Sequence, residues 1–213
     1  MVWGIKRIQL ISLKNMSKKN ILFYLLAVIV VAGSVAIFNL YNRSNQGKTT
    51  EINTLLAKVT AEEIIKGSDG VIIGTVKDLR ATKAPSSLRA EEGDIVTNVS
   101  IAVEKYLSNP KNLSLTNITV QVVGGTIGKE TMIAEDSPDF EVGQKVLVFL
   151  KQGSNGVFTV YGWSQGKYTV TNDKIAGSEK EQEIFKGIFG KELTINELEQ
   201  KISSLSSSSK DIK

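Results

Sequence analysis

The chain has 213 residues, with 26 lysines and arginines against 22 acidic residues and a formal net charge of +4. It contains no cysteine, which excludes disulfides and zinc–thiolate sites, and no histidine, which removes the commonest general base near neutral pH and the commonest metal ligand. Only 7% of the residues are aromatic, and the basic residues form no dense run with interleaved aromatics, so the pattern typical of a nucleic-acid-binding protein is missing.

The most apolar stretch runs from Ile21 to Tyr41 and contains no charged residue. About 20 apolar residues in a helix cross the hydrocarbon core of a bilayer, so this stretch predicts a transmembrane helix over residues 21–41. Residues 1–20 carry basic residues and no acidic one, which predicts a cytoplasmic leader and an extracytoplasmic location for everything after the helix. The expected location is therefore the plasma membrane, with a single pass and the lipid bilayer as a partner.

Two alternatives remain open for this region. The small residues between Ala32 and Ala36 suit a signal peptidase, although the apolar part of a signal peptide is usually only about 7 to 15 residues long. Met16 also begins a compact basic segment directly before the apolar stretch, so translation can start at either Met1 or Met16. The rest of the chain is exported in every case.

After the predicted anchor, about 170 residues remain, which is enough for one domain with its own core. Residues 42–51 are polar and predict a linker. Apolar positions recur at helical spacing over residues 52–67, and Thr60 with Glu63 forms a capping box, so we expect a short helix there.

Strand patterns then predict one β domain over residues 68–172. A strand is expected at 71–79, with Gly74 inside it marking a bulge. Residues 95–107 and 115–123 alternate between apolar and polar side chains, which predicts a long hairpin with one buried face.

The segment that follows is predicted to be irregular. Residues 124–129, Gly-Gly-Thr-Ile-Gly-Lys, lack the first glycine and the last Ser or Thr of a phosphate-binding loop, so they predict a turn. Residues 130–141 are acidic but lack the spacing of an EF-hand calcium loop, which favours a solvated loop. No metal and no cofactor is expected.

The remaining strands and helices have clear local signals. Residues 145–150 form a continuous apolar run, which predicts a strand buried on both faces, and Asn155-Gly156 predicts a hairpin turn. Residues 173–205 predict C-terminal helices, with a second capping box at Thr194 and Glu197, and residues 206–213 predict a disordered tail. Two further strands are expected, at 157–163 and 167–170.

The order of these patterns resembles a known module. The strings SDGVIIGTV, TNVSIAVEKYL, ITVQVV and FEVGQKVLVFL, between Ser68 and Val170, resemble the netrin-like module related to the tissue inhibitors of metalloproteinases. The resemblance implies a mainly β (α+β) fold: a small OB-like antiparallel β-barrel flanked by short helices. The pattern is also similar to uncharacterised single-pass membrane proteins of archaea and bacteria whose helical end is like LTINELEQKI, Leu193–Ile202.

The resemblance does not carry inhibitor activity to any residue of this chain. The family's cysteines are missing, among them the N-terminal cysteine through which the inhibitors chelate a protease zinc. We therefore expect a non-catalytic binding or assembly module at the cell surface, with a protein or surface polymer as partner. The expected contact residues are Tyr161, Trp163 and Tyr168, and the tripeptide Asn-x-Ser/Thr predicts possible N-glycosylation at Asn42, Asn98, Asn112 and Asn117.

Two other classes of function remain as alternatives. A carboxylate-dependent hydrolase needs two acids about 5 to 9.5 Å apart, and Asp94, Glu104, Asp136 and Glu141 are the acids near predicted strand ends. Oligonucleotide binding is common among OB folds, but the predicted export argues against a nucleic-acid partner.

Overall fold

The computed structural model describes residues 29–40, 47–52, 56–84, 93–153, 156–175 and 177–207. The chain divides into two units, Met1–Gln46 and Gly47–Lys213. In the first unit, residues 29–40 form a helix whose large apolar side chains, such as Ile29 and Phe38, are exposed. None of the helices in the described ranges combines the length and the apolar character needed to cross a bilayer. The predicted leader and both ends of the predicted transmembrane segment lie outside these ranges.

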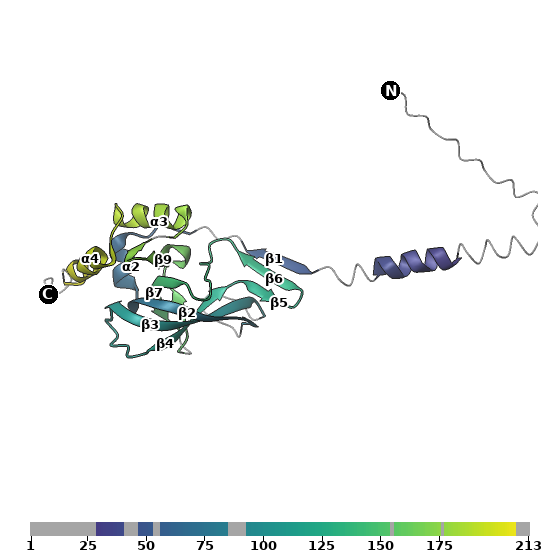
Figure 1. The fold of residues 1–213 in the computed structure, drawn as a ribbon, viewed down its shortest axis with the longest axis horizontal. Helices are drawn as coiled ribbons and strands as arrows, with labels where there is room; N and C mark the ends of the chain where they lie inside the picture. Colours follow the sequence, from purple (N-terminus) through teal and green to yellow (C-terminus); the bar gives the residue numbers. More distant parts are fainter. Residues whose placement is uncertain are drawn as a thin grey trace, which may run out of the picture. The chain divides into compact units, whose positions relative to one another are not determined.

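The second unit contains the sheets and the remaining helices (Figure 1). Its elements, in chain order, are β1 (Lys48–Ile52), α2 (Ala61–Gly67), β2 (Gly70–Lys83), β3 (Ile95–Ser108), β4 (Asn117–Val123), β5 (Gly125–Ile127), β6 (Glu130–Ala134), β7 (Lys145–Gln152), β8 (Phe158–Val160), the 3₁₀ turn η2 (Trp163–Gly166), β9 (Lys167–Thr171), β10 (Lys174–Ile175), α3 (Glu179–Phe189) and α4 (Ile195–Ser207).

The larger sheet has seven strands in the order β10-β9-β7-β2-β3-β4-β8, and β8 also pairs with β7. The mixed α+β class is as expected, but the predicted antiparallel barrel is wrong in two respects. The β4–β8 pairing is parallel, which makes the sheet mixed, and it covers only two residue pairs. Because β8 is only three residues long, the strands form a partly closed ring and not a complete barrel.

A smaller sheet has the order β1-β6-β5 and was not expected. Its hairpin, β5 and β6, occupies the segments predicted as a turn (124–129) and an acidic loop (130–141). The reversal between these strands uses Gly128 at φ +59°, a backbone conformation that glycine adopts without strain. The predicted linker, residues 42–51, ends in β1, which runs parallel to β6.

The predicted long hairpin is confirmed, since β3 and β4 pair antiparallel from Val96↔Val123 to Ala102↔Asn117. The bulge predicted at Gly74 is also confirmed, because the β2–β3 register shifts between Ile73 and Gly74. Side chains on the two faces of β7 enter two different cores, as expected for a strand buried on both faces.

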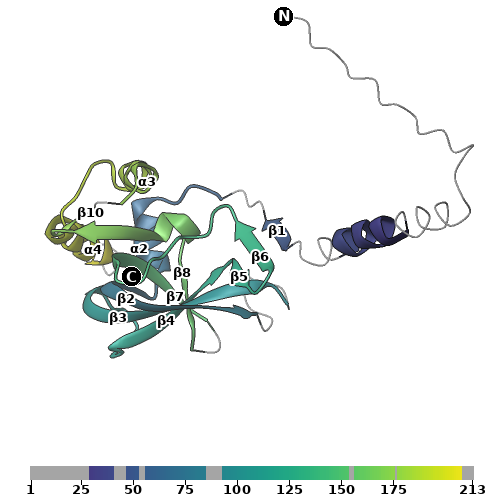
Figure 2. The same cartoon turned by 45° about the vertical axis from the view of Figure 1, so that its right-hand side comes forward.

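One core lies between the sheet and the helices. It includes Leu147 and Phe149 from β7, and Phe185 and Phe189 from α3. In both views α3 and α4 lie away from β4, and an ion pair between Lys105 of β3 and Glu199 joins α4 to the sheet (Figures 1 and 2). The other core lies within the partly closed ring and includes Val148 of β7.

Both predicted capping boxes form. The backbone N–H of Glu63 donates to Thr60 Oγ1 at 3.2 Å, while the Thr60 N–H donates to Glu63 Oε2 at 2.8 Å, and Thr194 with Glu197 repeats the pattern before α4. Helix α2 begins at Ala61, later than the predicted start at residue 52, and ends at Gly67 as predicted. Helices α3 and α4 lie in the region predicted to be helical, residues 173–205, although this region begins with the short strand β10. The tail beyond Ser207 lies outside the described ranges.

An ion pair buried under α3 fixes this helix to the sheet. Lys167 of β9 is only 3% exposed, and its Nζ lies 2.8 Å from Glu181 Oε1 on α3. The second carboxylate oxygen of Glu181 accepts the backbone N–H of Thr169 at 3.0 Å. The same Lys167 Nζ lies 5.5 Å from the ring centroid of Phe140. The pair therefore joins α3, β9 and the segment before β7.

We expect Gly74→Ala to lower the free energy of unfolding by about 1–3 kcal/mol, because overpacking a tight site forces the backbone to shift. A Cβ at this position would lie 2.5 Å from the backbone oxygen of Ala102. The matched control is Gly187→Ala in α3, where a Cβ meets nothing within 4 Å and should stabilise the helix by about 1 kcal/mol. Denaturant unfolding followed by circular dichroism measures both, and equal effects at the two sites would contradict the bulge geometry.

Candidate functional site

A cleft opens where β8 separates from β4. The two strands pair at Val120↔Phe158 and Gln121↔Thr159. All three residues of β8 also pair with β7 on the other side, but Val160 has no pairing residue on β4. The chain then turns away through Gly162 at φ +81° and Trp163 at φ +56°. This divergence leaves room beside the last residues of β4.

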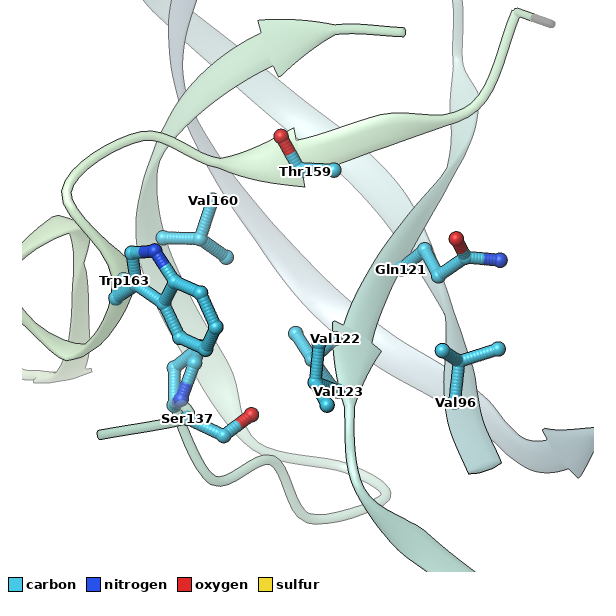
Figure 3. Close-up of a pocket in the computed structure, with 9 residues that line it drawn as sticks. Val96, Gln121, Val122, Val123, Ser137, Thr159, Val160 and Trp163 are labelled. Carbon is cyan, nitrogen blue, oxygen red and sulfur yellow. The ribbon is translucent and has the colours of Figure 1, made fainter. Parts of the chain in front are cut away.

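We call this space the β4–β8 cleft. It consists of two adjoining cavities of about 20 Å³ and about 290 Å³, which share Val122, Val123, Ser137 and Pro138 as lining residues. The smaller cavity, drawn in Figure 3, is also lined by Val96, Gln121, Thr159, Val160 and Trp163. The larger one is also lined by Leu79, Thr97, Val99, Gly124, Gly125, Met132, Ile133, Ala134, Asp139 and Phe140.

The Ser137 hydroxyl is the unusual polar group of this cleft. Its Oγ is buried and has no hydrogen-bond partner among the described residues. A buried polar group without a partner costs about 1–3 kcal/mol. In Figure 3 this hydroxyl points toward the side of the cavity formed by Val122 and Val123. The cleft therefore holds a hydrogen-bonding group that the fold itself leaves unused.

The other polar side chains of the cleft have partners. Gln121 Nε2 donates to Asn98 Oδ1 at 3.2 Å, and Thr97 Oγ1 donates to the Gly124 oxygen at 2.8 Å. Asp139 is the only charged residue among those lining the cleft, and its carboxylate forms no ion pair with any residue that the structure describes. The cleft thus combines an apolar wall, one buried hydroxyl and one exposed carboxylate.

The three aromatic residues expected to contact a partner do not lie together. Trp163 lines the cleft. Tyr168 is fully buried against Phe185, with ring centroids 5.0 Å apart, so a ligand cannot reach it in this structure, and burial raises the pKa of its phenol. Tyr161 packs on the helix side of the sheet, where a Cβ added at Gly67 would lie 2.3 Å from its hydroxyl.

The four acids considered for hydrolysis are not gathered in one cavity. Asp94 lines a polar groove beside β1 and β6, whereas Asp136 lines a groove along α3. Glu104 lies on β3, where Thr75 Oγ1 donates to it at 2.5 Å and Lys145 Nζ lies 2.9 Å away. Glu141 is exposed before β7. Within the described ranges, no group of three or more acidic residues could hold a metal ion.

The sequons differ in their surroundings. Asn112 and Asn117 are exposed, and Asn112 has φ +52° in the loop between β3 and β4. Asn98 is half-buried on β3, and its Nδ2, the atom that a glycan would modify, donates to Thr82 Oγ1 at 3.2 Å. Asn42 lies outside the described ranges.

A second cavity of about 350 Å³ runs along α3, between Ile184 and Ile188 on the helix and Leu56 on the segment before α2. Its central amide, Gln165, is already used within the fold. Gln165 Oε1 accepts the N–H of Val59 at 3.2 Å, and its Nε2 donates to the oxygen of Ala57 at 3.0 Å. This groove therefore lacks the unused buried group that distinguishes the β4–β8 cleft.

No protein-family model matches the chain, and no curated protein matches it in sequence.

We expect Ser137→Ala to raise the free energy of unfolding by about 1 kcal/mol, because it removes a buried hydroxyl that has no partner. The matched control is Ser68→Ala. Ser68 is also buried, but its Oγ donates to the Ile65 oxygen at 3.0 Å, so its loss should destabilise by about 1 kcal/mol. Chemical denaturation of the two variants checks this, and a destabilised Ser137→Ala protein would contradict the unused hydroxyl.

Glu104 makes stability depend on pH. The hydrogen bond from Thr75, followed by Lys145, lowers the pKa of this carboxyl below its usual 4.5. A lowered carboxyl pKa stabilises the fold above the ordinary value, and this contribution is lost as the pH falls through the lowered pKa. At pH 7 we expect Glu104→Gln to be less stable than the original chain by up to about 1 kcal/mol, with the gap closing in acid.

Unfolding curves between pH 7 and pH 2 test the Glu104 prediction. Glu141→Gln is the control, since the Glu141 carboxylate forms no ion pair with the described residues and its replacement should leave stability unchanged. A stability gap for Glu104→Gln that does not narrow as the pH falls would show that charge is not its cause.

Proposed function

We propose that this chain is a single-pass membrane protein that displays its sheet domain outside the cytoplasm as a non-catalytic binding or assembly module. The β4–β8 cleft is the binding surface. The observation that supports this function best is the buried Ser137 hydroxyl, which costs folding energy and faces an apolar cavity instead of a partner within the fold. A group of this kind gains its hydrogen bond when a ligand enters.

The membrane anchor is part of the same proposal. It is supported by the uncharged stretch from Ile21 to Tyr41 and by the basic residues before it. All 22 acidic residues of the chain come after this stretch. The asymmetry matches a cytoplasmic N-terminus followed by an exported domain.

The domain is further proposed to be a relative of the OB-like, netrin-type module. Five strands, β7, β2, β3, β4 and β8, follow one another around the partly closed ring, which is the number expected for that module. Binding at an opening in the ring agrees with a scaffold whose loops and strand ends carry the function.

A hydrolase and an oligonucleotide-binding protein have no specific observation in their favour. The candidate acids lie in separate places, as described above. The only charged residue of the cleft is acidic, so phosphate groups would be repelled there.

Because the chain contains no cysteine, a single introduced cysteine gives a specific label for topology. We expect Ser114→Cys, at an exposed position between β3 and β4, to react with a membrane-impermeant maleimide on intact cells. Ser17→Cys in the leader should react only after the membrane is opened. The two changes are the same substitution on opposite sides of the predicted anchor.

Labelling with a membrane-permeant maleimide controls for expression and reactivity of both variants. The reverse pattern, with Ser17→Cys labelled on intact cells and Ser114→Cys protected, would show that the proposed orientation is wrong.

A further inference from the structure

The end of β4 has a free edge inside the cleft. At Val122 and Val123, β4 pairs with Thr97 and Val96 of β3, and no other described strand pairs with it there. In an antiparallel ladder, every second residue directs its backbone N–H and C=O away from the partner strand. One of these two residues therefore presents both groups to the side where β8 has separated.

If β8 continued in its present direction, its next residues would lie beside this edge of β4. The β4–β8 register, Val120↔Phe158 and Gln121↔Thr159, stops two residues before β4 ends. On this side β4 is paired only at Val120 and Gln121, so its last two residues, which line the cleft, have no described strand beside them. A short extended peptide can add a strand to such an exposed edge.

The side chains around the cleft define the chemistry of the peptide. Val122, Val123 and Trp163 offer an apolar surface, and Ser137 offers a buried hydroxyl. Asp139 provides the only charge, which is negative and unpaired within the described residues. A complementary ligand therefore has an apolar side chain, which packs against the apolar surface, and a cationic side chain, which pairs with Asp139.

We propose that the β4–β8 cleft binds an extended segment of a partner protein, which pairs with the edge of β4 at Val122–Val123 and carries an apolar residue two positions before a lysine or arginine. Residues two apart in a strand lie on the same face, so both side chains can face the cleft. The apolar side chain enters the larger cavity, of about 290 Å³, and the cation lies against Asp139, which lines the same cavity. This inference rests on the proposed function and specifies its partner.

The fluorescence of Trp163 measures occupancy directly. The chain has only two tryptophans, Trp3 and Trp163, so a full-length Trp3→Phe variant in lipid nanodiscs emits from the cleft alone. The probe is the peptide acetyl-Thr-Leu-Thr-Lys-Thr-amide. One matched peptide replaces its Lys by Glu, and another carries N-methyl groups on alternate backbone nitrogens, which prevents strand pairing but keeps the side chains.

We expect saturable binding of the lysine peptide, at least about fivefold weaker binding of the glutamate peptide, and no binding of the N-methylated one. Asp139→Asn should weaken the lysine peptide about threefold. Asp173→Asn, the same change at an exposed turn residue that does not line the cleft, should leave the affinity unchanged. Ser137→Ala should weaken binding about threefold although the free protein becomes more stable, a combination that a purely structural role does not produce.

Five results would overturn the inference. Equal binding of the N-methylated peptide would exclude strand addition, and equal binding of the glutamate peptide would exclude recognition by Asp139. The same fluorescence change with hexylamine would identify a small-amine site, and self-association without peptide that Asp139→Asn abolishes would identify a second copy as the occupant. A complete absence of peptide binding, checked by calorimetry, would also overturn the inference. The cysteine labelling tests the orientation separately, so a failed topology and a failed peptide site are distinguishable.

Discussion

The short register between β4 and β8 is the constraint on which the rest of this structure depends. Two parallel residue pairs join β8 to β4, whereas all three residues of β8 pair with β7. A longer β8 would complete the ring and fill its interior with side chains, as small barrels do. Because the strand is interrupted, the fold keeps an unpaired strand end beside Ser137 and Trp163. The partly closed ring and the candidate site therefore both result from the short pairing between β4 and β8.

Local signals predicted most of the elements, because each depends on residues close together in the chain. The capping boxes at Thr60 and Thr194 form as expected, since the two hydrogen bonds of each box join residues three apart. The bulge at Gly74 follows from the close approach of the Ala102 backbone, which only glycine permits. Alternation in β3 and the apolar run in β7 likewise predicted which faces are buried.

Features that depend on distant partners were not predictable in this way. The hairpin of β5 and β6 is short and polar on its surface, so its segments have the composition of a loop, and pairing with β1 places it in a sheet. The parallel contact of β4 with β8 joins residues far apart in sequence. Ser137 lies in the segment predicted as a solvated loop, and the absence of a partner for its hydroxyl is a property of the folded surroundings. Of the three aromatic residues, only Trp163 reaches the cleft, since strand position alone does not distinguish a core face from an accessible one.

The buried ion pair between Lys167 and Glu181 restricts how this sequence can change. Removing one member leaves the other charge without compensation in the interior, whereas a simultaneous exchange of both for apolar residues of similar volume is tolerated in other folds. Substitutions at these two positions are therefore epistatic, and neither position is free to drift alone. Since Lys167 also contacts Phe140, which lines the cleft, a change at this pair also alters the packing beside the candidate site.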